Sequence, residues 1–378
     1  MVQAAYLHIP FCEQICHYCD FNKVFLKGQP VDEYLQYMDT EMKNTIEAYP
    51  PSMLKSIFVG GGTPTVLSVK QLEAFLSSIN KYLTPRSENI EFTFEANPGD
   101  LTEDKLKVLL DSGVNRISFG VQTFDDELLK AIGRTHRRND VFQTLELAKH
   151  VGFENISIDL MYALPHQTIE SFQESLDLAF SLDVEHVSAY SLIIEPKTVF
   201  YNLMRKGKLN LPSQEHEAKM YETLMDEMEK HGFHQYEISN FSKNGFESRH
   251  NLTYWNNEEY YGIGAGAHGY VAGKRISNAG PIKKYMSAID EHGFPHVETH
   301  SVTLQEKMEE ELFLGLRKTK GVSISHFQKK FSVSIFDVFE SQIKEQKAKG
   351  LLEEKNDFIR LTHNGKFLGN DVFQAFLL

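Results

Sequence analysis

Residues 4–21 read AAYLHIPFCEQICHYCDF, and this stretch carries all three cysteines of the 378-residue chain. A strand-like run over residues 4–9 leads into Cys12, Cys16 and Cys19, which are spaced C-x3-C-x2-C. Such a loop can bring three thiolates together, and thiolates are the protein ligands of iron–sulfur clusters. Three ligands on a four-iron cube leave one iron without a protein ligand. The spacing therefore predicts a [4Fe–4S] cluster with one iron open to chemistry.

Two other interpretations of the cysteines stay open at this point. A structural zinc ion needs a fourth ligand, which His8 or His17 could supply, although zinc motifs more often carry two distant C-x2-C pairs. The cysteines could also have only a packing role. A disulfide would leave one cysteine over, and nothing in the sequence points to an oxidising compartment.

Working outward, short apolar strands alternate with helical stretches near 31–48, 68–82, 102–112, 139–151 and 168–182. This rhythm implies parallel strands joined by helical crossovers, which build either a doubly wound sheet or a β/α barrel. Polar and glycine residues gather after the strand ends, where a barrel places its site, so we expect an α/β fold with a partial (β/α)6 TIM-like barrel. The expected strands are Ala4–Ile9, Ser56–Val59, Ile90–Ala96, Arg116–Val121, Asn155–Leu160 and His186–Leu192.

The β/α rhythm stops near residue 198. An amphipathic helix is expected over 215–231, followed by an aromatic, histidine-rich segment over 236–270. Beyond residue 303, short helices precede a hairpin near 351–361, a pattern typical of a winged-helix module, although the acidic run at 305–311 argues against a DNA-binding role. We expect a core domain over 1–235, a connecting segment over 236–300 and a small, mainly helical, winged-helix-like module over 301–378.

The overall charge and hydropathy exclude some functions. There are 39 Lys and Arg against 52 Asp and Glu, a net charge of −13, which disfavours nucleic-acid binding because that depends on cations at phosphates. No apolar run is long enough for a membrane span. The first residues lack the pattern of a signal peptide, so we expect a reducing, cytoplasmic setting that keeps thiols available for metal.

Residues 60–64 read GGGTP directly after the second expected strand. Ordering three glycines on folding costs conformational entropy. A ligand that the backbone must approach closely would explain why glycines are present, and a tight turn is the alternative explanation. Together with the cysteine loop one strand earlier, this motif resembles the radical S-adenosylmethionine (SAM) superfamily. The resemblance implies that the open iron binds the amino and carboxylate groups of SAM, and that the glycines hold its methionyl end.

Longer sequence segments resemble one family of that superfamily, the oxygen-independent coproporphyrinogen III dehydrogenases. These segments are YLHIPFC at 6–12, EANP at 95–98, SFGVQTF at 118–124, GRTH at 133–136 and DLMYALP at 159–165. Taken alone, Glu95 could cap a helix, Arg134 could be a surface cation and Asp159 a strand-end acceptor. The resemblance implies SAM contacts, the last three of them to a second SAM in the dehydrogenases, for Tyr6, Tyr18, Gly61, Gly62, Thr63, Glu95, Gln122, Arg134 and Asp159.

One departure decides the branch. The dehydrogenases carry a fourth cysteine two residues after the third, and here that position is Phe21; their N-terminal extension is also missing. The chain thus resembles the shorter HemW-type heme chaperones. His250-Asn-Leu-Thr-Tyr-Trp255 is similar to their H-N-x-x-Y-W motif, which implies His250 as a heme contact, although a lone histidine is more often a structural hydrogen-bonding residue. His268 is a weaker candidate.

The resemblance implies one function and leaves two alternative functions open. The expected function is a heme chaperone that binds a [4Fe–4S] cluster, SAM and heme, delivers heme to apo-hemoproteins such as respiratory cytochromes, and forms a homodimer. It implies no dehydrogenase activity and leaves open whether SAM is cleaved. The rivals are oxidative decarboxylation of coproporphyrinogen III, and a radical SAM enzyme with an unrelated substrate.

Overall fold

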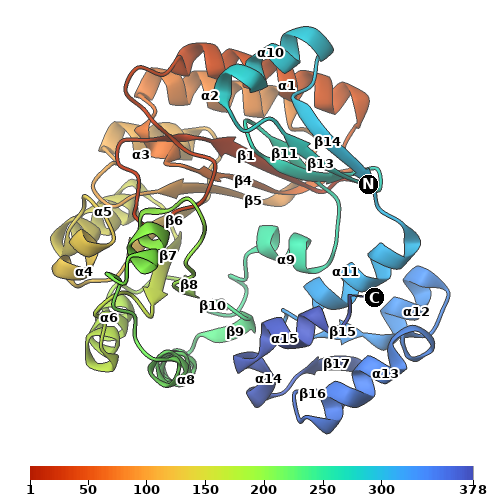
Figure 1. Ribbon diagram of the computed structural model, residues 1–378. Helices are drawn as coiled ribbons and strands as arrows, with labels where there is room; N and C mark the ends of the chain where they lie inside the picture. Colours follow the sequence, from red (N-terminus) through yellow and green to blue (C-terminus); the bar gives the residue numbers. More distant parts are fainter. Residues whose placement is uncertain (378) are drawn as a thin grey trace.

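The computed structural model describes residues 1–377 (Figure 1). Its centre is a curved, twelve-stranded sheet whose six middle strands run parallel in chain order. This confirms the α/β, partial-barrel architecture, and each expected strand is present. The six strands are β1 (Ala4–Ile9), β4 (Leu54–Gly61), β5 (Arg86–Ala96), β6 (Arg116–Gln122), β7 (Asn155–Tyr162) and β8 (His186–Ser191).

Helices cover the convex face of this sheet, as Figure 1 shows. Two of these helices begin at residues that the sequence suggests as N-caps. Ser68 and Gln71 form a capping box, and Thr102 accepts a hydrogen bond from the Lys105 N–H. Five helices match the expected ranges and α4 was not expected. They are α1 (Val31–Ala48), α2 (Val69–Tyr82), α3 (Glu103–Asp111), α4 (Asp126–Ala131), α5 (Arg138–Val151) and α6 (Ile169–Ser181).

Strand alternation gives the sheet one apolar and one polar face. On β6, Ile117, Phe119 and Val121 join the main hydrophobic core, whereas Ser118 and Gln122 lie on the concave face at a cavity. Burial of the apolar set against the helices therefore leaves polar side chains directed into the barrel. This arrangement is what positions the site.

Residues 236–300 contribute strands to the main sheet and are not only a connecting segment. Their strands extend both edges of the sheet: β9 and β10 follow β8, and β11 pairs parallel with β1, bringing Tyr260 opposite Ala4. The domain boundaries at 235 and 300 stay a prediction. The elements after β8 are α7 (Val199–Arg205), α8 (Gln214–Lys230), β9 (His234–Glu237), β10 (Asn240–Ser242), α9 (Arg249–Trp255), β11 (Tyr260–Ile263), β12 (His268–Val271), β13 (Lys274–Asn278), α10 (Ile282–His292) and β14 (His296–Ser301).

The C-terminal part packs around a hydrophobic core of its own, which includes Leu312, Phe339 and Phe373. The expected hairpin is present, and a third short strand joins it in the order β15-β17-β16. Within residues 1–377, no helix has the length and apolar character to cross a membrane. The elements are α11 (Leu304–Gly315), β15 (Val322–Ser323), α12 (Ile324–Phe331), α13 (Ile335–Ala348), β16 (Leu352–Lys355), β17 (Phe358–Leu361), α14 (His363–Phe367) and α15 (Gly369–Gln374).

Candidate functional site

A cavity of about 320 Å³ opens at the carboxyl ends of the parallel strands. Eleven of the thirteen predicted site residues line it; Tyr6 and His250 do not. The cavity thus gathers side chains from five strands and from the cysteine loop, as expected for a barrel site. The predicted residues that line it are Cys12, Cys16, Tyr18, Cys19, Gly61, Gly62, Thr63, Glu95, Gln122, Arg134 and Asp159.

The three cysteines are free thiols on one wall of this cavity. Cys12 is 6% exposed, and burial raises the pKa of its thiol to about 11, opposed by a hydrogen bond from Thr63. Within residues 1–377, no three His, Cys, Asp or Glu side chains converge as a site for a single metal ion. An iron–sulfur cube is larger than one ion, so three thiols spread over a wall suit it better than they suit zinc.

Of the two histidines considered as a fourth zinc ligand, His8 has both ring nitrogens in hydrogen bonds and His17 has one. His8 Nδ1 lies 2.8 Å from the Tyr6 hydroxyl and its Nε2 lies 2.7 Å from the Asn22 carbonyl oxygen. His17 Nδ1 lies 2.9 Å from the carbonyl of Ala131. These contacts leave no ring nitrogen of His8 for zinc, and Tyr6, which bonds to His8, does not line the cavity.

Close approach of the backbone explains the glycine run. Gly61 has φ of +116°, and a Cβ there would lie 2.6 Å from the His8 ring. A Cβ on Gly62 would lie 2.7 Å from the carbonyl oxygen of Phe11 and 2.9 Å from Cys12 Sγ. The second strand end therefore lies directly against the cysteine loop, and larger residues would force the two apart.

Two carboxylates face the cavity. Glu95 Oε2 accepts a hydrogen bond from the Gly61 N–H at 3.1 Å, and Asp159 Oδ1 accepts one from Ser118 at 3.3 Å. Burial, and then the charge of Asp159, raise the pKa of Glu95 to about 8. Burial also raises the pKa of Asp159. The alternative role of Glu95 as a cap is wrong, since Thr102 caps the next helix.

Arg134 is one of two cations that line the cavity, the other being Lys23. One terminal nitrogen donates to Asn97 Oδ1 at 2.7 Å and the other to the Tyr18 hydroxyl at 2.8 Å. Its Nε is buried without a hydrogen-bond partner among residues 1–377. A buried donor without a partner is costly, so this atom fits contact with a bound ligand. Arg134 is therefore no surface cation.

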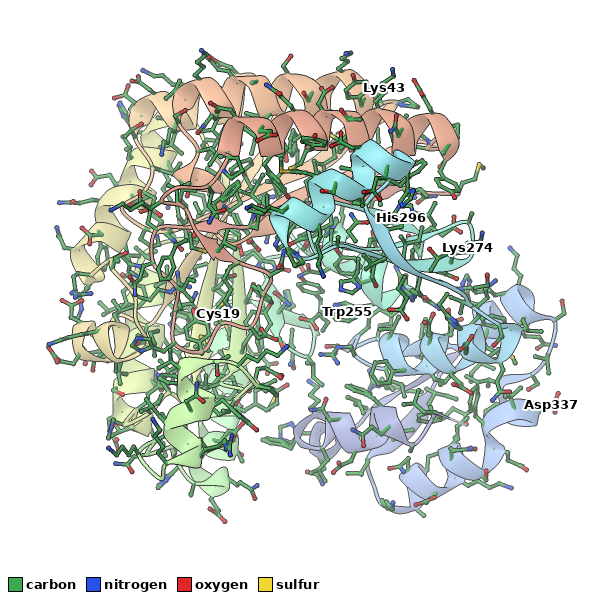
Figure 2. All side chains as sticks on the ribbon, turned by 45° about the horizontal axis from the view of Figure 1, so that its top comes forward. Cys19, Lys43, Trp255, Lys274, His296 and Asp337 are labelled. Carbon is green, nitrogen blue, oxygen red and sulfur yellow. The ribbon has the colours of Figure 1, made fainter. Side chains whose placement is uncertain are left out.

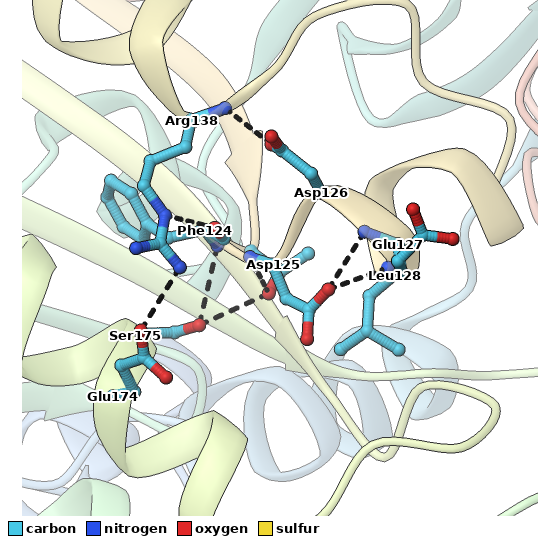
Figure 3. Close-up of polar contacts among 9 residues, drawn as sticks. Phe124, Asp125, Asp126, Glu127, Leu128, Arg138, Glu174 and Ser175 are labelled. Atoms are coloured by element: carbon cyan, nitrogen blue, oxygen red, sulfur yellow. Dashed lines mark hydrogen bonds and ion pairs between the residues drawn. The ribbon is translucent and has the colours of Figure 1, made fainter.

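The loop after β6 lies between Gln122 and Arg134, and Figure 3 shows the polar contacts of its residues 124–128. Gln122 sits at a register shift with φ of +67°, a left-handed conformation that residues with a Cβ rarely adopt. Downstream, Asp125 accepts from two N–H groups at the start of α4, and Arg138 Nε donates to the carbonyl of Phe124 at 2.7 Å. These bonds hold the turn that leads to Arg134.

Several cavity residues were not predicted as site residues. Asn97 lies within the EANP motif and could have been found there, and Tyr190 lies two residues beyond Ser188 on the same face of β8. Phe21, at the position of the fourth cysteine, also lines the cavity and is 63% exposed. The remaining ones, except for Lys23, lie within the quoted motifs, but their residue types gave no chemical reason to select them: Gln14, Ile15, Lys23, Pro64, Ala96, Ser118, Gly120 and Met161.

His250 lies at the other end of the strands and is 1% exposed. Its Nδ1 lies 3.0 Å from Ser56 Oγ and its Nε2 lies 2.7 Å from the Tyr254 hydroxyl, while its ring stacks on Phe58. Burial, and then the nearby Arg116 charge, lower the pKa of His250 to about 3. In this arrangement neither ring nitrogen is available to heme iron, and the histidine ties α9 to β4.

Comparison with known proteins adds the following. Residues 6–179 match the model of the radical SAM superfamily, and residues 302–368 match that of the HemN C-terminal domain. The chain is 58% identical over 376 residues to the heme chaperone HemW of Bacillus subtilis, covering 100% of this chain and 99% of that protein. It is 48% identical to the heme chaperone HemW of Lactococcus lactis, over 99% of this chain and 97% of that protein.

More distant proteins share the fold. The heme chaperone HemW of Escherichia coli is 34% identical over 98% of this chain and 97% of its own length. The solved structure of the radical SAM enzyme coproporphyrinogen III oxidase (HemN) from Escherichia coli superimposes with a TM-score of 0.86 at 22% identity, covering 99% of this chain and 90% of that one.

Proposed function

Because the chain belongs to the HemW family within the radical SAM superfamily, we propose that it is a heme chaperone. Its cofactors are a [4Fe–4S] cluster and SAM, and its cargo is heme. The acceptors in this proposal are apo-hemoproteins such as respiratory cytochromes, reached from the cytoplasm by a homodimer. The observation that carries the proposal is 58% identity to a heme chaperone along the whole chain.

The cysteine loop holds the cluster in this proposal, through Cys12, Cys16 and Cys19. A [4Fe–4S] cluster with an open iron supplies one-electron reduction of a sulfonium bound beside it. The protein itself has three tasks in this proposal. The Cys12 thiol, whose pKa is raised, must lose its proton to bind iron. The hydrogen bond between His8 and Asn22 keeps the cysteine loop in place, and the cavity limits access of water.

We assign the remainder of the cavity to SAM. In this proposal the backbone at Gly61, Gly62 and Thr63 would hold its methionyl end, and Glu95 would accept hydrogen bonds from its amine N–H groups or its ribose hydroxyls. The Nε of Arg134 gains a partner, and Tyr18 stays beside the cluster through its bond to Arg134. Gln122 and Asp159 bound the far wall, and Tyr6 supports the loop from behind through His8.

Cluster binding is tested by anaerobic reconstitution. Wild type is expected to show the broad absorption of an iron–sulfur cluster and four irons per chain, and Cys12→Ala, Cys16→Ala and Cys19→Ala to lose it. Zinc gives no such absorption band, so a colourless, zinc-loaded protein would contradict the proposal.

Chaperone function is tested by heme transfer. Heme-loaded protein is expected to raise the holo fraction of an apo-cytochrome faster than free heme at the same concentration does. The same preparation, given coproporphyrinogen III, SAM and reductant without oxygen, is expected to form no protoporphyrinogen, in keeping with Phe21 at the fourth-cysteine position. Turnover would assign the chain to the dehydrogenases instead.

A further inference from the structure

The cysteine loop is anchored close to each of its cysteines. Cys12 lies on the short strand β2 (Phe11–Cys12), which pairs with β3 (Val24–Phe25) and closes the loop at its base. Next to the second cysteine, the His17 N–H donates at 3.0 Å to a backbone carbonyl at the C-terminal end of α4. Three residues after the third cysteine, the side chain of Asn22 makes hydrogen bonds that the assignment of the cluster and SAM does not use.

The side chain of Asn22 is held by a seat formed by residues 264–266, in the turn between β11 and β12, and by Gly280 after β13. Its Nδ2 donates to the carbonyl of Ala265 at 2.7 Å and to that of Gly280 at 2.9 Å, so both amide hydrogens have acceptors. Gly266 lies against the same side chain, because a Cβ at this residue would lie 2.7 Å from Asn22 Nδ2. The glycine-rich turn therefore leaves just enough room for an asparagine of the cysteine loop.

This seat is itself tied to the barrel. The Gly264 N–H donates to the buried carboxylate of Glu41 on α1 at 2.8 Å. The Tyr34 hydroxyl accepts from the Ala265 N–H at 2.9 Å and donates to the carbonyl of His8 on β1 at 2.8 Å. These bonds connect the seat to α1 and β1, so that Asn22 is held against a fixed part of the fold.

Asn22 does not line the cavity that its neighbours line. Cys19, Phe21 and Lys23 all border the cluster cavity, whereas the Asn22 side chain is bonded to the seat. The backbone of Asn22 is held as well, since His8 Nε2 donates to its carbonyl oxygen at 2.7 Å. Lys23 Nζ donates in turn to the carbonyl oxygen of Cys19. Holding Asn22 in the seat therefore fixes the chain on which the third thiol is carried.

We propose that Asn22 is a positioning residue for the third cysteine: its two amide hydrogen bonds to Ala265 and Gly280 fix Cys19 and thereby set how firmly the cluster is held. The proposal rests on the [4Fe–4S] cluster of the proposed function. Loss of the two bonds leaves two carbonyls without this donor and frees Cys19, while Cys12 keeps its own anchor in β2. Residues that orient metal ligands typically change metal affinity by about 10- to 100-fold when they are replaced.

The test is the rate of iron release from anaerobically reconstituted protein to an excess of chelator, with the EPR spectrum of the reduced cluster recorded in parallel. Asn22→Ala removes both donors, and Asn22→Asp keeps the shape but presents only acceptors to the two carbonyls. Both variants are expected to release iron at least about tenfold faster than wild type and to shift the g values of the cluster. Asn44→Ala is the matched control, because Asn44 Nδ2 also donates to a carbonyl, that of Gly293 at 2.7 Å, but between α1 and α10.

A pair of glycine variants tests the seat from its other side. Gly266→Ala places a methyl against Asn22 and should release iron about as fast as Asn22→Ala. Gly273→Ala brings a similar backbone strain, since φ is +72° there and +75° at Gly266, but its Cβ would meet only the end of a lysine side chain at 3.4 Å. Figure 2 shows the adjacent Lys274 well away from Cys19. Gly273→Ala is therefore expected to release iron like wild type.

The outcomes separate this proposal from the proposed function. A wild-type release rate or a wild-type EPR spectrum in both Asn22 variants overturns the positioning role. Equally fast release from Asn44→Ala or Gly273→Ala also overturns it, because the effect would then be a general loss of stability. If wild type takes up no cluster, the proposed function itself fails. Circular dichroism checks that each variant is folded, and should the Asn22 variants not fold, the comparison of Gly266→Ala with Gly273→Ala decides.

Discussion

The raised pKa of Glu95 makes SAM affinity depend on pH in a calculable way. With a pKa of about 8 in the empty cavity, the carboxyl is roughly nine-tenths protonated at pH 7. SAM carries a permanent positive charge on its sulfonium, which favours the carboxylate form of Glu95, so binding releases the proton. Affinity is therefore close to full above about pH 9, half of that at pH 8, and falls by about 50-fold between pH 8 and pH 6 as Glu95 becomes protonated.

The assay is isothermal titration of SAM into anaerobically reconstituted protein at pH 6, 7 and 8, in two buffers of different ionisation heat. Wild type is expected to release roughly 0.9 proton per SAM from Glu95 at pH 7. Glu95→Gln cannot release it and should bind with a flatter pH profile. Because the SAM amine titrates equally in both proteins, the difference between the two profiles isolates Glu95.

A further variant, Asp159→Asn, tests why the pKa of Glu95 is raised. Burial is the first cause of the raised pKa of Glu95 and the charge of Asp159 the second, so Asp159→Asn should move the midpoint to lower pH without removing the dependence. Identical pH profiles for wild type and Glu95→Gln would refute the reasoning, because they would show that Glu95 does not exchange a proton when SAM binds.

Three further predictions concern the chain itself. Gly62→Ala places a methyl 2.7 Å from the Phe11 carbonyl, so iron bound after reconstitution should fall well below that of wild type while the circular dichroism stays unchanged. Glu41→Ala should lower the free energy of unfolding by about 3–5 kcal/mol in urea, because three buried donors lose their acceptor, whereas Glu47→Ala on the exposed side of the same helix should change it by less than about 0.5 kcal/mol. His250→Ala should cost about 2–4 kcal/mol by the same measurement while heme stoichiometry is kept; equal stability to wild type would contradict its structural role.

Local patterns were sufficient to predict the parallel strands, and the family resemblance named eleven of the residues that line the cavity at their carboxyl ends. The strands β5, β6 and β7 alternate apolar and polar residues over most of their length, and polar residues lie at or near their carboxyl ends, so their existence and their chemically active ends are visible in the sequence. Residues such as Cys12 and Gly62 meet because carboxyl ends of parallel strands share one edge. The short helix α4 was missed because its six residues are too few for a periodic signal.

Long-range pairing explains what the sequence did not reveal. The strands β11–β14 are short and, in β14, mostly exposed, and β11 joins the sheet by pairing Tyr260 with Ala4, 256 residues earlier. His250 was taken for a heme ligand from its motif alone. Its partner Ser56 lies 194 residues away, so no local pattern could show that its nitrogens are occupied.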